Sequence, residues 1–190
     1  MTNEEKFNLL GDKIAACQRC KELVEGRIKT VLGDGNPSSK IVLLGEAPGA
    51  NEAKQGVAFV GRAGQLLDNI LNACGLDRTK VYILNVLKCR PPSNRAPTPE
   101  EAANCRPFLD LQLDVIKPDY IVCLGASAAH HLLNEETPIS QMRGKWFDYK
   151  GIKAICTFHP AYLLRQPAKK KDVWDDFQLL VKKLSPQNDG

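Results

Sequence analysis

Four of the seven cysteines lie in sequence contexts that suit metal binding. Cys17 and Cys20 form a CQRC pair, whereas Cys89 and Cys105 follow much later, each beside basic residues. Four thiolates that meet at one point repel each other unless a metal neutralises them, and both tetrahedral zinc and iron–sulfur clusters accept four cysteines. Structural zinc sites usually contain two short pairs, so this uneven spacing favours a cluster assembled by the tertiary structure. Scattered buried cysteines are the alternative.

The other three cysteines, Cys74, Cys123 and Cys156, lie in apolar segments, and we expect them in the core. The first residues, MTNEEKFNLLGDK, lack the apolar stretch of a secretory signal. No apolar run approaches the ~20 residues that cross a bilayer. We therefore expect a cytoplasmic protein without a membrane partner, in which the reducing environment disfavours disulfides.

Of the three histidines, only His159 directly follows a predicted strand. A neutral imidazole in that place can donate a hydrogen bond to a developing anion. His130 and His131 fall on a predicted helix, where we expect surface or packing roles.

Alternating apolar strands and amphipathic helices must position these side chains. Strands are predicted over 40–46, 81–89 and 119–125, with a hairpin over 145–158 that contains a fourth core strand, and helices over 4–24, 64–76, 98–116, 127–136 and 172–184. This order predicts an α/β fold, a three-layer α/β/α sandwich with a four-stranded parallel sheet. In such folds ligands bind at the carboxyl ends of the strands.

The composition is that of an ordinary globular domain. Of 190 residues, 43% are hydrophobic and 25% charged, and 26 basic against 22 acidic residues give a net charge of +4. Because no repeat or linker divides the chain, we expect a single domain over residues 1–190 and a monomer. Several cations fall in predicted loops, where they either contact phosphates or form a solvated surface.

The loops after the first two strands supply candidate binding groups. Gly45, Glu46 and Glu52 lie in GEAPGANE, whose glycines let a backbone approach a ligand closely, although the spacing is not that of a phosphate loop. Phe59 either presents a stacking surface or caps the core. Asn85, in an apolar strand, either bonds to backbone or reads the edge of a nucleobase.

The loop after the last strand, HPAYLLR, combines apolar residues with Arg165. Exposed apolar side chains beside a cation suit a protein that wedges open a base stack while it holds a phosphate. A short helix that packs Leu163 and its neighbours inward is the alternative.

Three segments together closely resemble the family 4 uracil-DNA glycosylases, the iron–sulfur type first known from thermophiles. They are GEAPGANEAKQGVAFVGRAGQLL (45–67), LNVLKCRPPSNRAPTPEE (84–101) and HPAYLLR (159–165), and the likeness extends from about Cys17 to the C-terminal helix. The resemblance implies a four-stranded parallel sheet between helices. It also implies one 4Fe–4S cluster on Cys17, Cys20, Cys89 and Cys105, which we expect to brace the loops that meet DNA.

The resemblance further implies that the partner is uracil-containing DNA, single- or double-stranded, and that free uracil is the product. Phe59 would stack on uracil, Asn85 would read its Watson–Crick edge and His159 would face O2. Glu52 resembles the residue placed near C5, where the methyl group of thymine would clash. Leu163 matches the residue that fills the gap left by the extruded nucleotide.

The first loop departs from the wider superfamily, in which many members carry Asp where this chain has Ala47. Glu46 is then the nearest candidate for a water-activating carboxylate, through its side chain or its backbone. Gly45 and Ala47 are expected to contact the substrate, and Arg165 to contact DNA.

Three other hypotheses remain open at this point. A relative that captures the abasic sugar covalently needs a histidine in a loop insertion, and 89–98 contains none. A non-catalytic iron–sulfur protein that binds DNA or senses redox state would keep its function without His159. A zinc-binding structural module would be colourless.

Overall fold

Four parallel strands form the centre of the protein, whose structure is a computed structural model that describes residues 1–186. The sheet has six strands in the order β1-β3-β2-β4-β6-β5. The parallel strands are β2 (Ile41–Gly45), β3 (Tyr82–Asn85), β4 (Tyr120–Leu124) and β6 (Ile152–Thr157). Two antiparallel edge strands, β1 (Asp34–Gly35) and β5 (Trp146–Tyr149), complete the sheet. The predicted four-stranded parallel sheet and the hairpin predicted over 145–158 are therefore confirmed, and β1 is an additional edge strand.

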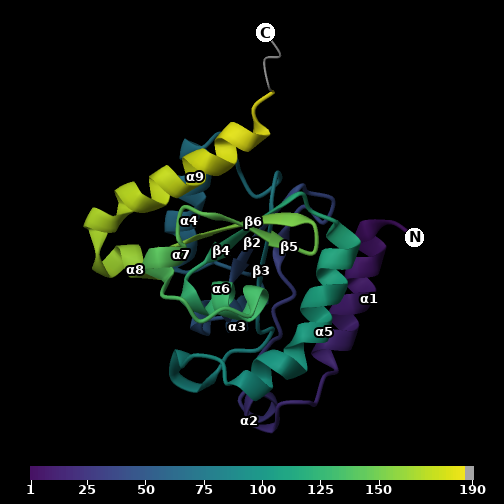
Figure 1. Cartoon of the computed structure of the whole chain (residues 1–190). Helices are drawn as coiled ribbons and strands as arrows, with labels where there is room; N and C mark the ends of the chain where they lie inside the picture. Colours follow the sequence, from purple (N-terminus) through teal and green to yellow (C-terminus); the bar gives the residue numbers. More distant parts are fainter. Residues whose placement is uncertain (187–190) are drawn as a thin grey trace.

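Helices cover both faces of the sheet, which confirms the three-layer sandwich (Figure 1). Side chains of successive residues point to opposite faces of a strand. Val42 and Leu44 therefore pack in one apolar cluster with α1 (Asn3–Ala15), α5 (Pro99–Ile116) and α6 (Ala126–Leu133).

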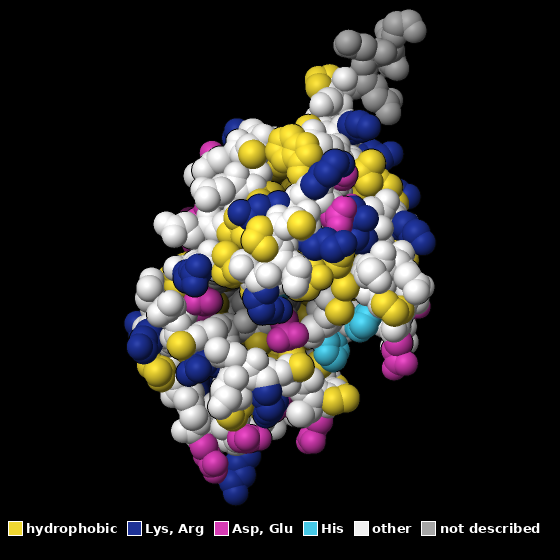
Figure 2. All heavy atoms as spheres, turned by 90° about the vertical axis from the view of Figure 1, so that its left-hand side faces the viewer, with side chains coloured by type: hydrophobic (Ala, Val, Ile, Leu, Met, Phe, Trp, Pro, Cys, Tyr) yellow, Lys and Arg dark blue, Asp and Glu magenta, His cyan; other side chains and the backbone are white. Residues whose placement is uncertain are grey.

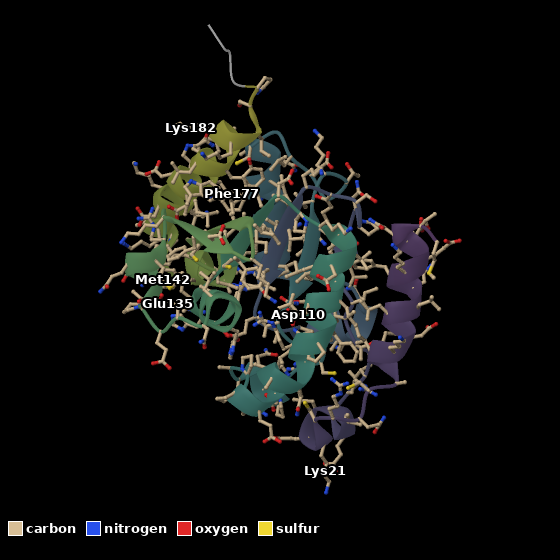
Figure 3. The ribbon with its side chains drawn as sticks, turned by 45° about the vertical axis from the view of Figure 1, so that its right-hand side comes forward. Lys21, Asp110, Glu135, Met142, Phe177 and Lys182 are labelled. Atoms are coloured by element: carbon tan, nitrogen blue, oxygen red, sulfur yellow. The ribbon has the colours of Figure 1, made fainter. Side chains whose placement is uncertain are left out.

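Ile41 and Leu43 pack in the other cluster with α4 (Arg62–Ala73) and α9 (Lys170–Leu184). Phe177 of α9 is buried between this helix and the sheet (Figure 3). No helix in the described part of the chain is both long and apolar enough to cross a membrane.

The helix predicted over 4–24 is interrupted, which is a correction. α1 ends at Ala15, and a separate short helix, α2 (Lys21–Glu25), follows after Cys17 and Cys20. The guanidinium of Arg27 donates to the carbonyls of Ala15 and Cys17, each at 2.9 Å. It thereby satisfies carbonyls that a continuous helix would have used itself, and after the break both cysteines line a cavity together with Ile14 of α1.

The strand predicted over 81–89 is shorter than expected. β3 ends at Asn85, because Lys88 turns back and donates from Nζ to the Asn85 carbonyl at 2.6 Å. This turn carries Cys89 away from the sheet. A capping box starts α5: Thr98 Oγ1 accepts from the Glu101 N–H, and the Glu101 carboxylate accepts from the Thr98 N–H.

The remaining helices are short and lie near the carboxyl ends of the strands. They are α3 (Ala50–Gln55), α7 (Ile139–Met142), α8 (Pro160–Arg165) and the 3-10 turns at Pro92–Asn94 and Pro167–Lys169. The HPAYLLR segment, expected as a loop, thus forms α8.

Candidate active site

A cavity of about 590 Å³ lies at the carboxyl ends of the parallel strands. The segments after all four of these strands contribute to its wall, as expected for an open α/β sheet. Its lining includes Glu46, Ala47, Glu52, Arg95, Ser127, His159 and Arg165. Figure 2 shows the face on the side of α8 and α9, where Lys and Arg side chains gather around exposed hydrophobic ones.

His159 is fixed as a neutral hydrogen-bond donor. It caps α8, and its Nδ1 accepts from the Ala161 N–H at 3.0 Å. Burial, with a smaller effect of the Arg165 charge, lowers the pKa of His159 from 6.5 to about 4. At neutral pH the remaining ring proton is therefore on Nε2.

The packing around His159 leaves it little freedom. A Cβ on Gly125, whose φ is +94°, would lie 2.9 Å from the His159 Cβ, so only a glycine allows this approach. The Phe59 ring stacks on the imidazole, with ring centroids 5.5 Å apart and an interplanar angle of 27°.

Gly45, Asn85 and Phe59 form a buried cluster beside the cavity. The parallel register of β2 and β3 aligns Gly45 with Asn85. A Cβ on Gly45 would lie 2.4 Å from Asn85 Oδ1 and 2.8 Å from the Phe59 ring, so a side chain here would displace both. Asn85 Oδ1 is buried and has no hydrogen-bond partner among the described residues. A buried acceptor without a partner is rare and costs about 1–3 kcal/mol, so this oxygen is set up for a ligand that donates.

Two carboxylates flank the cavity. Burial raises the pKa of Glu46, and a hydrogen bond with Ser127 opposes this rise. Glu52 Oε2 is buried without a partner in the described structure. Sequence reasoning missed Ser127, which follows closely after β4. A serine so near a strand end was the signal available.

The apolar residues of α8 are arranged differently from the expectation. Leu163 is 0% exposed and packs with Val173 and Phe177 of α9, so its predicted exposure is wrong and the inward-packing alternative holds. His159 starts α8 as its N-cap, and this start directs Leu163 to the core. Leu164 is 39% exposed instead. Arg165 lines the cavity.

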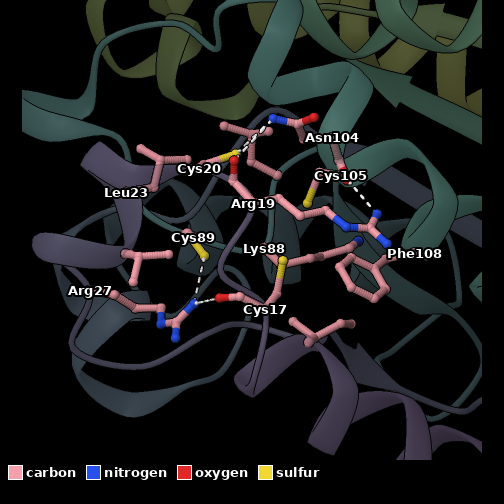
Figure 4. A pocket seen from close by; sticks show the side chains of 13 residues that line it. Cys17, Arg19, Cys20, Leu23, Arg27, Lys88, Cys89, Asn104, Cys105 and Phe108 are labelled. Atoms are coloured by element: carbon pink, nitrogen blue, oxygen red, sulfur yellow. Dashed lines mark hydrogen bonds between the residues drawn. The ribbon is translucent and has the colours of Figure 1, made fainter.

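The four candidate cysteines line a second cavity (Figure 4), which shares no lining residue with the first. They come from the break after α1, the turn after β3 and the second turn of α5, and they are Cys17, Cys20, Cys89 and Cys105. Among residues 1–186, no three His, Cys, Asp or Glu side chains are grouped to hold a single metal ion.

Donors face these sulfurs. Arg27 Nη1 lies 3.9 Å from Cys89 Sγ, and Asn104 Nδ2 lies 3.6 Å from Cys20 Sγ. Burial raises the pKa of the Cys89 and Cys105 thiols, opposed by the Arg27 and Lys88 cations respectively. The cavity thus supplies positive charge and hydrogen-bond donors to sulfur, as a thiolate centre requires.

The sequence model of the uracil DNA glycosylase superfamily matches residues 32–178. The chain belongs to this superfamily. It is 46% identical over 166 residues to the type-4 uracil-DNA glycosylase of Thermotoga maritima, with 86% of each chain covered. It is 44% identical over 174 residues to that of Archaeoglobus fulgidus, with 87% of each covered. A type-5 uracil-DNA glycosylase of Thermus thermophilus is 30% identical over 151 residues, 63% of this chain and 68% of that one. The resemblance drawn from the sequence motifs is confirmed.

The two neighbouring leucines of α8 provide a matched pair for a stability test. Leu163→Ala removes buried methyl groups and should lower the free energy of unfolding by about 2–5 kcal/mol. Leu164→Ala, at an exposed position, should change it by less than about 0.5 kcal/mol. Urea denaturation followed by circular dichroism measures both, and equal losses would contradict the placement of Leu163 in the core.

Proposed function

We propose that the protein is a DNA repair glycosylase that hydrolyses the N-glycosidic bond of uracil in DNA and leaves an abasic site and free uracil. The observation that carries this proposal is the unpartnered Asn85 Oδ1 in a cluster with Phe59 and Gly45. The matching type-4 relatives carry this activity in their names. They do not favour the alternative, a non-catalytic iron–sulfur protein.

Uracil offers the complement of the Asn85 side chain. Its N3–H donates to Oδ1 and its O4 accepts from Nδ2, so both amide atoms gain partners. Phe59 supplies the stacking surface. Gly45, which has no side chain, allows Asn85 and Phe59 to approach closely, and Ala47 presents only a methyl group to the cavity. Glu52, whose Oε2 is buried without a partner in the described structure, stands near C5 in this assignment and excludes the thymine methyl group.

Cleavage separates a uracil anion from a sugar that develops positive charge. His159 donates a hydrogen bond from Nε2 to O2 of uracil and stabilises the anion. Its pKa of about 4 keeps the imidazole neutral, so the ring does not have to be deprotonated before it acts. The Glu46 carboxylate, held by Ser127, stabilises the cationic sugar and orients the attacking water. We assign this role to the side chain, because the Glu46 carbonyl already accepts from the Leu87 N–H at 3.1 Å.

Uracil inside a duplex is out of reach, so the nucleotide must leave the stack, at a cost of a few kcal/mol. Arg165 at the cavity contacts phosphate, and the exposed Leu164 beside it takes the wedge role that the sequence resemblance gave to Leu163. We also propose a single-domain monomer that acts in the cytoplasm on single- or double-stranded DNA.

We also propose that Cys17, Cys20, Cys89 and Cys105 hold one 4Fe–4S cluster. Four thiolates spread around a cavity suit a cluster, since each binds a different iron, and the facing Arg27 and Asn104 donors suit its sulfurs. When bound, the cluster supplies a covalent brace between segments and takes no part in bond cleavage.

The loop that follows Cys89 extends from the cysteine cavity to the active site. Arg95 lines the larger cavity and forms ion pairs with Glu22 of α2 at 3.2 Å and with Glu101 of α5 at 2.7 Å. The elements that carry Cys20 and Cys105 are thereby tied to the wall of the active site.

Asn85→Leu tests base recognition. Single-turnover release of uracil from an oligonucleotide with one uracil should fall on the order of a hundredfold, as expected for two lost hydrogen bonds. The thermal midpoint should stay level or rise, because the substitution removes a buried acceptor that lacks a partner. A thymine-containing oligonucleotide serves as the control and should remain intact. Uracil release by the variant at the wild-type rate would overturn the assignment.

Glu46→Gln tests the carboxylate through the pH dependence of the single-turnover rate. The wild-type rate should fall as the pH drops through the raised pKa of Glu46, because the protonated side chain no longer stabilises positive charge. The variant should be roughly a hundredfold slower. Its remaining acid limb should lie near pH 4, where His159 becomes protonated. An unchanged profile would show that Glu46 acts through its backbone alone.

Cys20→Ser and Cys74→Ser form a pair that tests the cluster, because Cys74 is also half-buried but lies outside the four-cysteine cavity. Anaerobically purified wild-type protein and Cys74→Ser should be brown and contain four irons per chain, whereas Cys20→Ser should lose iron and colour. Stoichiometric zinc in the wild type would contradict the cluster.

A further inference from the structure

Arg78 contacts the backbone of the residue that would stack on uracil. It lies in the turn between α4 and β3, and its guanidinium donates to two consecutive carbonyls. Nη1 donates to the Ala58 carbonyl at 2.8 Å, and Nη2 donates to the Phe59 carbonyl. The Arg78 side chain thus holds the segment that ends at Phe59 by two hydrogen bonds to its backbone.

Two carboxylates fix the guanidinium itself. Nε pairs with Asp68 of α4 at 2.7 Å, and Nη1 pairs with Asp34 of β1 at 2.8 Å. The Arg78 side chain is only 23% exposed. Arg78 therefore connects an edge strand, a helix and the Phe59 segment, and its planar donors satisfy all four acceptors at once.

The Phe59 backbone needs such support. Its φ of +53° lies in the left-handed region, which a phenylalanine adopts only where its surroundings hold it there. Gly64 in the first turn of α4 packs directly on this segment, because a Cβ there would lie 1.8 Å from the Phe59 carbonyl oxygen. Gly64 removes a steric obstacle to this conformation, whereas Arg78 supplies the attraction that maintains it.

We propose that Arg78 is a positioning residue for uracil recognition, which acts through the backbone of Phe59. It holds the ring against Gly45 and stacked on His159, so that the stacking surface is in place before the base arrives. Without the guanidinium, the two carbonyls lose their donor and Phe59 relaxes toward negative φ, which carries the ring away from the site. This inference rests on the proposed function, since it assigns uracil to the Phe59 ring.

Lysine cannot replace this arginine. An ammonium group is a compact point charge and does not present paired donors in a plane. Arg78→Lys therefore keeps the charge near Asp34 and Asp68 but loses the fork to Ala58 and Phe59. Arg62 offers a matched control, because it lines the same hollow of about 490 Å³ and Arg62→Lys is the same chemical change.

A double-mutant cycle of Arg78→Lys and Phe59→Ala tests the proposal. Arg78→Lys should weaken inhibition by free uracil and raise KM for the uracil oligonucleotide on the order of tenfold, with little change in the single-turnover rate at saturation. Phe59→Ala should do the same. The double variant should be no worse than Phe59→Ala alone, because Arg78 has nothing left to position. Arg62→Lys should behave as the wild type.

The outcomes separate this inference from the proposed function. Unchanged uracil inhibition in Phe59→Ala would overturn the stacking assignment itself. A loss in Phe59→Ala with none in Arg78→Lys, or losses that multiply in the double variant, would overturn only the role of Arg78. If Arg78→Lys does not fold, Asp34→Asn replaces it in the cycle. That variant removes one of the two carboxylates that fix the guanidinium, so the contacts to the Ala58 and Phe59 carbonyls are held less firmly. It should weaken inhibition by free uracil severalfold, and only while Phe59 is present. No weakening would overturn the inference.

Discussion

The parallel pairing of β2 with β3 places the end of one strand directly beside the end of the other, and the active site is built on this contact. Gly45 and Asn85 are partners in the register, and the space that Gly45 leaves empty is filled by the Asn85 amide and the Phe59 ring. A shift of one residue would turn Asn85 to the opposite face of the sheet. Recognition of the base therefore depends on strand register before it depends on any loop.

Burial then determines the charge state of the groups around this contact. Burial and the nearby Arg165 charge lower the pKa of His159, so its imidazole is neutral. Burial also raises the pKa of Glu46, which therefore holds its proton more tightly than a free carboxyl. The sheet thus provides one neutral donor and one tuned carboxylate at the same edge. These are the complementary parts that a reaction with separated charges requires.

The sequence allowed the sheet, the helix order and the placement of His159 at a strand end to be predicted, because apolar runs and strand ends are local patterns. The break after Ala15 was missed, since it depends on Arg27 reaching back to two carbonyls. Leu163 was expected to be exposed but is buried. Which side chains of the short helix α8 are buried depends on its packing against α9, which the local sequence does not show.

Arg78 was missed for a related reason. Nothing in the sequence around it indicates chemistry, and its four acceptors come from β1, α4 and the Phe59 segment. Such a residue is recognisable only after the chain has folded, because its partners are separated along the sequence and no spacing pattern connects them.

The origin of the four cysteines has a consequence for how the protein matures in the cell. They come from the beginning of the chain, from the turn after β3 and from α5, and they line one cavity only when α1 packs against α5. In a small zinc finger the metal and the fold form together from neighbouring residues. Here folding must bring the sulfurs together first, so delivery of a cluster would be a late step of biogenesis, after the ribosome has released at least the whole of α5.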